Sequence, residues 1–263
     1  MKHFKVIWAY RYFIISSIIT EFRTKFVRSR LGAIWMIAHP LAQVAIYALV
    51  LSAVLSTKFP GVQSQYAYAV YLMAGMLAWT LFAEVFSRSL TIFIDNGNLL
   101  KKMSFPKIAL PLIVFGTAII NNLLLLISIL VVFGILGHPL FLSLIWLILL
   151  ISLTLSLAAG LGLIAGIMNV FIRDIGQMMP IVLQFWFWLT PVVYVSSIIP
   201  EKYKYLLMLN PMSSVVMSYQ DVLLYGRAPD LLTLIYPCGL ALLSLFLASW
   251  IYYRANEEMA DVL

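Results

Sequence analysis

The chain has 263 residues, of which 63% are hydrophobic and only 10% are charged, and its mean hydropathy is +1.02. A soluble domain typically carries about 25% charged residues and at most about 50% apolar ones, so this composition excludes an ordinary soluble enzyme or a disordered regulator. It predicts an integral membrane protein. The net charge of +7 would also suit nucleic-acid binding, and the positions of the basic residues decide between these interpretations.

Residues 1–33 precede the first long apolar stretch and are predicted to form an amphipathic helix. Apolar side chains recur there at spacings of three and four: Ile15, Ile18 or Ile19, Phe22 and Phe26. The basic residues lie largely off that stripe. This pattern is typical of a helix in the headgroup region of a membrane, with its basic face toward water and anionic lipid. It suits a passive anchor and a functional interface helix equally well.

The rest of the chain, residues 34–263, contains six apolar stretches that approach the roughly 20 residues of a spanning helix. They cover residues 34–56, 66–86, 108–137, 140–172, 178–195 and 231–253. The fifth stretch is short, and Pro180 and Pro191 predict a start and a break within it. We therefore expect an all-α integral membrane protein with six transmembrane helices, preceded by the interface helix.

Most of the 17 Lys and Arg residues fall in the leader, between spans two and three, between spans four and five, and in the tail. By the positive-inside rule these segments, and with them both termini, face the cytoplasm. The basic excess is thus explained by topology, and nucleic-acid binding is disfavoured. The segment of residues 99–107 places Leu, Met and Phe among lysines, which indicates either a plain stop signal or a docking element for a cytoplasmic partner.

The outer connection between spans five and six holds two apolar pieces too short to span, near residues 203–209 and 212–224. Two dipeptides resemble helix starts: Pro200-Glu201 and Asn210-Pro211. We expect short re-entrant helices that gate a water-filled cavity, because irregular backbone at membrane depth is tolerated only beside protein or water. A surface-lying hairpin without a gate role is the alternative.

Catalytic and energy-coupling motifs are missing from the sequence. There is no Gly-x4-Gly-Lys-Ser/Thr sequence for cradling a nucleotide phosphate, and no catalytic or metal-binding constellation. Glu84 and Arg88 stand one helical turn apart and indicate either an interfacial ion pair or a proton relay. The single cysteine, Cys238, lies in an apolar run and is expected to be a buried hydrophobe.

Aromatic and small side chains dominate what remains inside the spans. Six aromatic residues are candidates for a surface along which sugar rings slide: Trp35, Tyr47, Trp79, Trp186, Trp188 and Tyr194. Membership of the aromatic belt at the membrane surface is the alternative for some of them. In span four, Ala158, Gly162 and Gly166 recur every four residues and favour close helix packing.

Several segments, in order along nearly the whole chain, resemble one known family. They are residues 21–41, which run from Glu21 through a basic stretch and a Leu-Gly turn to His39-Pro40-Leu41; residues 99–111, with Lys-Lys-x-x-Phe-Pro; residues 169–175; residues 186–194; and the outer motifs Pro200-Glu201-Lys202, Asn210-Pro211-Met212 and Tyr219-Gln220-Asp221. The chain resembles the membrane subunit of ABC-2-type polysaccharide exporters, the family of O-antigen and teichoic-acid permeases.

This resemblance implies a transport subunit rather than an enzyme. The family implies a homodimer in the bacterial cytoplasmic membrane, two copies of a separate ABC ATPase subunit that binds ATP and Mg, and no cofactor on this chain. The implied cargo is an undecaprenyl-pyrophosphate-linked polysaccharide that leaves through a channel at the dimer interface. O-antigen is favoured. Teichoic-acid or capsular polysaccharide export, or a small-lipid or drug exporter of the same architecture, are the alternatives.

The resulting site assignments fall into four groups. The aromatic residues named above form the expected substrate path, and Arg28 and Arg30 the expected site for the lipid pyrophosphate. Coupling to the ATPase subunit is expected from Glu21, Leu100, Lys101, Lys102, Met103 and Phe105. The expected outer gate comprises Pro200, Glu201, Asn210, Pro211 and Tyr219.

Overall fold

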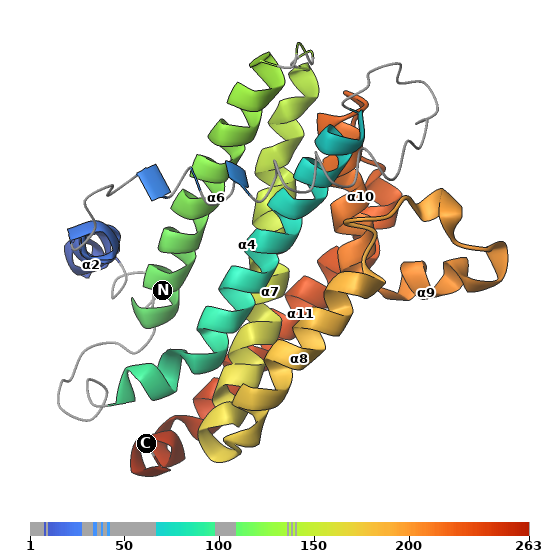
Figure 1. Ribbon diagram of the computed structural model, residues 1–263. Coiled ribbons are helices and arrows are strands. Elements are labelled where there is room, and N and C mark those ends of the chain that lie inside the picture. The colour runs from blue at the N-terminus through green and yellow to red at the C-terminus, as the bar shows by residue number, and fades with distance from the viewer. Residues whose placement is uncertain are drawn as a thin grey trace.

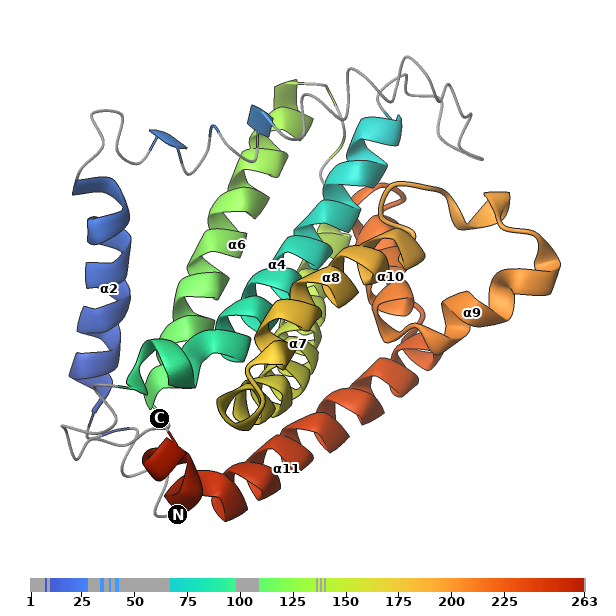
Figure 2. The ribbon, with the colours of Figure 1, turned by 60° about the horizontal axis from the view of Figure 1, so that its bottom comes forward.

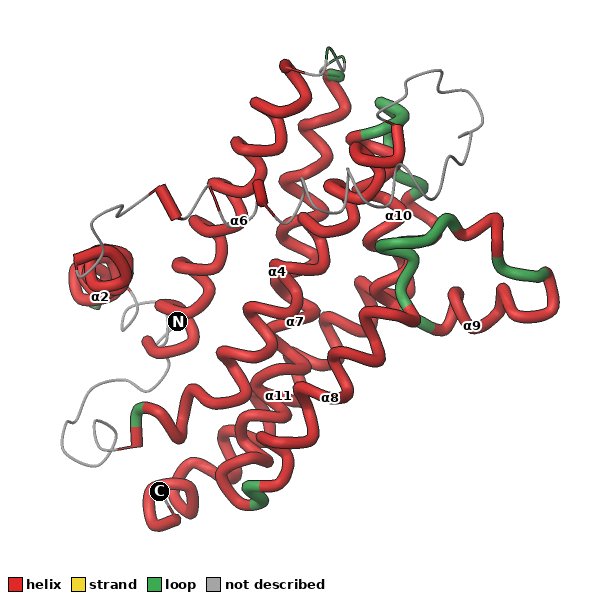
Figure 3. The backbone as a smooth tube through the Cα atoms, in the orientation of Figure 1, coloured by secondary structure: helices red, strands yellow, loops and turns green. Residues whose placement is uncertain are grey.

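The computed structural model describes residues 8, 10–27, 34–35, 38, 41–42, 67–97, 109–135, 137, 139 and 141–262 (Figure 1). Within these residues every regular element is a helix (Figure 3). Most of the expected first span lies outside the described residues. So do eight of the predicted site residues: Arg28, Arg30, Tyr47, Leu100, Lys101, Lys102, Met103 and Phe105.

Four helical stretches are long and apolar enough to cross a membrane, and they match the expected second, third, fourth and sixth spans. They are Ala67–Asp95, Ala109–Ile135, Leu142–Phe171 and Leu231–Ala255. The first two are α4 and α6. The third combines η1 (Leu142–Ile145) with α7 (Trp146–Phe171), and the fourth belongs to α11 (Leu231–Val262). The multi-pass, all-helical architecture is confirmed, whereas a total of six spans stays a prediction.

Helix α4 lies at the centre of the bundle (Figures 1 and 2). It packs against α7 along most of its length, and also against α6 and α10. It continues to Asp95, beyond the expected end at residue 86, because Leu90, Ile92 and Phe93 are also buried there. Residues 67–79, the first part of α4, are all buried, and a helix segment that is apolar on every side is typical of such a central position.

Small residues bring α7 close to both of its neighbours, as its spacing pattern predicted. A methyl group on Gly166 would overlap the backbone carbonyl of Ser89 on α4, and a Cβ on Gly162 would lie only 2.9 Å from the Ser89 Cβ. On the other side, Gly160 faces Ser244 of α11. Helix α7 is therefore the shared layer between α4 and α11.

The fifth apolar stretch forms α8 (Asp174–Leu189), which begins and ends earlier than the expected residues 178–195. Pro180 lies inside the helix rather than at its start, so that prediction was wrong, whereas the predicted break at Pro191 is confirmed. Thr190 is extended (φ −102°, ψ 136°), as expected for a residue that precedes proline. The helix has 16 residues and is about 24 Å long, short of the roughly 30 Å of a hydrocarbon core. Helix α8 by itself does not meet the length of a span.

The outer connection contains η2 (Ser196–Ile198), η3 (Glu201–Tyr203), α9 (Lys204–Leu209) and α10 (Pro211–Leu223). The last two match the predicted short helices, but their surroundings differ. Helix α9 projects from the bundle (Figure 2) and has no buried residue. Helix α10 is mostly buried. Their proposed role as a gate stays a prediction.

The leader forms α2 (Arg11–Val27), as the sequence predicted. It packs against α6 through Ile14, which is buried, and Ile18, which contacts Gly116. Ile15 and Ile19 are exposed, so the predicted apolar stripe is divided between a protein contact and an outer face. In Figure 1 α2 is seen end-on while α6 and α4 are seen from the side, so α2 crosses the long helices rather than running parallel to them.

Candidate functional site

A non-helical segment, residues 190–195, lies inside the bundle between α8 and η2. Thr190 and Val192 have 1% and 0% of their surface exposed. Buried backbone without secondary structure needs other hydrogen-bond partners, because an unpaired peptide group is costly away from water. The surrounding helices therefore have to supply hydrogen-bond partners for the backbone of residues 190–195.

Side chains of α4 and α10 supply those partners. The Tyr71 hydroxyl lies 3.0 Å from the Pro191 carbonyl oxygen and 2.8 Å from that of Tyr194. Tyr68 donates to the Val193 carbonyl over 2.8 Å, and the Gln220 amide donates to the Pro191 carbonyl over 2.9 Å. The segment is thus clamped from two helices.

Asn210 connects this clamped segment to α8 and α10. Its Oδ1 accepts from the Met212 backbone N–H at 3.0 Å, which caps α10, and from the Trp186 indole N–H at 2.8 Å. Its Nδ2 donates to the Thr190 hydroxyl at 2.9 Å. The cap followed by Pro211 in the first turn is the helix start that the sequence predicted.

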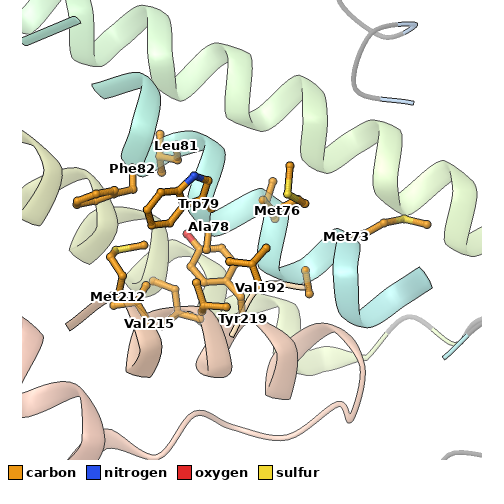
Figure 4. Packing of buried hydrophobic residues seen from close by; sticks show 14 of the residues in the cluster. Met73, Met76, Ala78, Trp79, Leu81, Phe82, Val192, Met212, Val215 and Tyr219 are labelled. Carbon is orange, nitrogen blue, oxygen red and sulfur yellow. The ribbon is translucent and has the colours of Figure 1, made fainter. Parts of the chain in front are cut away.

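Two of the predicted path residues, Trp79 and Trp186, belong to an aromatic cluster between α4 and α8. Figure 4 shows Trp79 and Phe82 of this cluster, with Met212 of α10 nearby. Trp186 meets Phe82 edge-on at 5.1 Å, and Trp79 lies 5.5 Å from Phe187 between ring centroids. Trp79 is 7% exposed. Within this one chain both indoles act in packing, and a role along a substrate path stays a prediction.

The remaining path and gate residues lie in different surroundings. Trp35 and Trp188 are exposed, and Tyr194 is half-buried. Of the gate residues, Tyr219 is fully buried with its hydroxyl 3.4 Å from that of Thr154. Pro200 and Glu201 are exposed. The Lys204 ammonium, 2.6 Å from the Glu201 carboxylate, lowers the pKa of that carboxyl.

Sequence reasoning missed the exposed face of α8. Gln177 and Gln184 are both exposed, and their spacing of seven places them on one side of the helix, together with Trp188. The side-chain amide of neither glutamine makes a hydrogen bond within the described part of the chain. The signal that could have found them is the presence of two carboxamides, two turns apart, in an otherwise apolar stretch.

A polar network joins α2 to the long helices. Arg88 of α4 lies 2.7 Å from the Glu21 carboxylate of α2 and 3.7 Å from that of Glu84. Thr117 of α6 donates to Glu21 over 3.1 Å, and Asn121 donates to Glu84. Glu84 and Arg88 therefore contact each other as an ion pair. The participation of Glu21, distant in sequence, was not predicted.

A groove of about 300 Å³ between α7 and α8 has an almost entirely apolar lining. Its walls include three methionines: Met168, Met178 and Met179. Such a lining offers no hydrogen bonds to a sugar. Among the described residues, no three His, Cys, Asp or Glu side chains come together as metal ligands would.

Residues 13–224 match the ABC-2 type transporter model. The chain belongs to this family. It is 30% identical over 259 residues to the O-antigen export system permease protein RfbA of Myxococcus xanthus, covering 97% of this chain and 96% of that protein.

Other relatives are named for the same kind of transport. An RfbA of Klebsiella pneumoniae is 27% identical over 92% of both chains, and the polysialic acid transport protein KpsM of Escherichia coli is 24% identical over 91% of this chain and 92% of that protein. These relatives are polysaccharide transport proteins rather than enzymes. The resemblance inferred from the sequence motifs is thereby confirmed.

Proposed function

We propose that this chain is the permease subunit of an ATP-driven exporter of lipid-linked polysaccharide, and that its cargo is O-antigen. Two copies of the chain, with both termini in the cytoplasm of a bacterial inner membrane, form the channel at their interface. Two separate ATPase subunits bind ATP and Mg. The higher identity to the O-antigen permeases, 27–30% against 24% for the polysialic acid protein, supports O-antigen over capsule.

The observation that carries the proposal is the unpaired polar face of α8. On the neighbouring helices, the side-chain amides and two serines of α7 donate hydrogen bonds inside the chain. Ser152, which is exposed on α7, and Ser156, which is half-buried there, donate to the carbonyls four residues earlier, over 2.7 Å each. Paired amides occur at Asn121, Asn122, Asn169 and Gln220. Gln177 and Gln184 differ from all of these, since their amides are exposed and unpaired in the described part of the chain.

An unpaired carboxamide facing lipid tails is costly, and polar side chains within membrane segments generally face protein or a water-filled cavity. A path for a polysaccharide has to be wet, because sugar hydroxyls need hydrogen-bond partners throughout transit. The α8 face offers amide donors and acceptors beside an exposed indole. These contacts are few and weak, which suits a chain that must keep moving.

The test measures surface polysaccharide in a host strain whose own copy of the gene is deleted, with variants compared at equal membrane levels. The parental chain restores surface polysaccharide, and only when the ATPase partner is hydrolytically active. Gln177→Leu combined with Gln184→Leu slows export several-fold while the protein inserts normally. An intact polysaccharide coat in the deletion strain would refute the proposed function.

The matched control is Ser152→Leu combined with Ser156→Leu on α7. It also removes two polar side chains from one side of a helix, but their hydroxyls are bonded to backbone carbonyls of the same helix. We expect parental export from this variant. Equal loss of export in the two double variants would mean that the α8 face has no special role.

A further inference from the structure

Arg88 occupies a position between two carboxylates from different helices. Its Nη2 lies 2.7 Å from Glu21 of α2, within hydrogen-bond distance, while its Nη1 lies 3.7 Å from Glu84 on its own helix, which is too far for a hydrogen bond. Nη1 is buried and makes no hydrogen bond. The guanidinium is thus bonded to α2 through Nη2, while Nη1 is approached by Glu84 without a hydrogen bond.

The network is sheltered enough for its pairing to matter. The side chains of Glu21, Glu84 and Arg88 are each little more than a quarter exposed. Arg88 lies seven residues before the end of α4 at Asp95, about 10 Å along the helix axis. In such a position a charge that loses its partner is strongly destabilising. Separation of α2 from α4 therefore requires another acceptor for Arg88.

Glu84 has the geometry of that acceptor. It stands one turn before Arg88 in the favourable acid-to-base order, and Asn121 of α6 already holds its Oε1 in place. Glu21 keeps the hydroxyl of Thr117 as a second partner, 3.1 Å away, although that hydroxyl is shared with the Ile113 carbonyl at 2.9 Å. A small rotation of the Arg88 side chain would exchange the pair with Glu21 for a pair with Glu84, without leaving the guanidinium unpaired.

We propose that Arg88 is the residue that couples α2 to the membrane helices, and that it passes from Glu21 to Glu84 when α2 moves away from them. Arg88 is then a positioning residue for export, acting through Glu21, and Glu84 holds it while α2 is displaced. This inference rests on the proposed function, because nucleotide turnover in the ATPase partner supplies the movement of α2.

Crosslinking between α2 and α6 reports the position of α2 directly. Ile18 contacts Gly116 so closely that a Cβ at Gly116 would overlap it, and the smaller cysteine at residue 18 makes room. The pair Ile18→Cys and Gly116→Cys is introduced with Cys238→Ser, which removes the single native cysteine. Crosslinking by a short bifunctional reagent is compared in the purified complex without nucleotide and with ATP and vanadate.

In the parental background, crosslinking is high without nucleotide and falls about fivefold or more on trapping. In Arg88→Gln, crosslinking is low both without nucleotide and with ATP and vanadate. Export is reduced in this variant, while ATP hydrolysis continues. Glu84→Gln keeps crosslinking high in both conditions and also reduces export. The double variant Glu21→Gln with Arg88→Gln loses no more crosslinking or export than the more damaging of the two single variants. Both substitutions remove the same Glu21–Arg88 ion pair.

Arg254→Gln is the matched control, since it removes an exposed guanidinium from α11 outside the network and should leave crosslinking and export at parental values. If Arg88→Gln fails to insert, Glu21→Gln tests the same ion pair from α2. Parental crosslinking and export in Arg88→Gln or in Glu84→Gln overturns the inference. Absence of polysaccharide export in the parental strain contradicts the proposed function instead, and the crosslinking still tests the exchange.

Discussion

Helices α7 and α8 follow each other in sequence, are both strongly apolar, and lie in opposite kinds of surroundings. Helix α7 is long and packs between α4 and α11 through glycines, and its Asn169 is fully paired. Helix α8 is short and exposes most of its surface, with only Ile175 and Leu183 buried. Hydropathy does not separate these two helices, whereas the hydrogen-bond partners of their polar side chains do.

Hydrogen bonds from neighbouring helices hold α8 at its two ends. Its start is tied to α7, because Gly176 donates its backbone N–H to the Asn169 Oδ1 at 2.9 Å. Its end is tied to α10 through Asn210. A helix anchored at its ends and exposed along its length is suited to lining a surface rather than to forming a core.

The contrast between α7 and α8 predicts the largest loss of stability when the paired amide of Asn169 on α7 is removed. Asn169→Leu removes a 3.0 Å hydrogen bond to the Leu90 carbonyl and the acceptor for Gly176. We expect a loss of about 3 kcal/mol in the free energy of unfolding, because buried partners are left unpaired. A titration of the detergent-solubilised protein with a denaturing detergent measures it.

Gln184→Leu on α8 is the matched substitution. Like Asn169→Leu it replaces an amide by leucine, but here the amide is exposed and unpaired. The expected change in unfolding free energy is within about 0.5 kcal/mol. Similar losses for the two variants would remove the proposed distinction between α7 and α8.

A smaller effect is expected from Gly166→Ala, which tests the close packing of α7 on α4. The added methyl group overlaps the Ser89 carbonyl, and overpacking of this kind costs about 2 kcal/mol. Gly239→Ala on α11 adds the same methyl group where nothing lies within 4 Å, and should be neutral or stabilising by up to about 1 kcal/mol. A neutral result for Gly166→Ala would mean that α7 is not held by tight packing.

A loss of stability smaller than those of Asn169→Leu and Gly166→Ala is expected at Asn210, which ties the end of α8 to α10. Asn210→Ala removes the cap of α10 and the bonds to Trp186 and Thr190, which should cost about 1–2 kcal/mol. Asn210→Asp retains an acceptor for the Met212 N–H and the Trp186 indole and should lose less. The same titration ranks the two variants. If alanine and aspartate are equivalent, the side chain of Asn210 does not hold the end of α8.

Much of the fold was predictable because it depends on local sequence. Apolar runs gave the four long helices, and Asn210-Pro211 gave the start of α10. At the fifth stretch the break predicted at Pro191 is confirmed, whereas the start predicted at Pro180 was wrong, because α8 begins at Asp174 and contains that proline. Cys238, expected to be buried, is exposed, because an apolar residue in a membrane helix can face lipid as readily as protein.

The site was less predictable because its contacts join distant parts of the chain. Glu21 and Arg88 meet across two helices, and Tyr71 reaches the carbonyls of Pro191 and Tyr194. Trp79 and Trp186 have the composition of a sugar-binding surface, yet they pack in a core. An aromatic ring in a membrane helix is equally suited to both roles, and only its neighbours separate them.

The sequence by itself determined that this is an all-helical, multi-pass membrane protein with the motifs of a polysaccharide permease, because hydrophobicity and helix signals act over a few residues at a time. The tertiary structure alone decided which polar groups are satisfied within the chain. It paired Glu21 with Arg88, clamped residues 190–195, and left the two glutamines of α8 exposed. Such bonds between distant segments form only when two helices pack with the right axial position and rotation. No local sequence pattern specifies that packing.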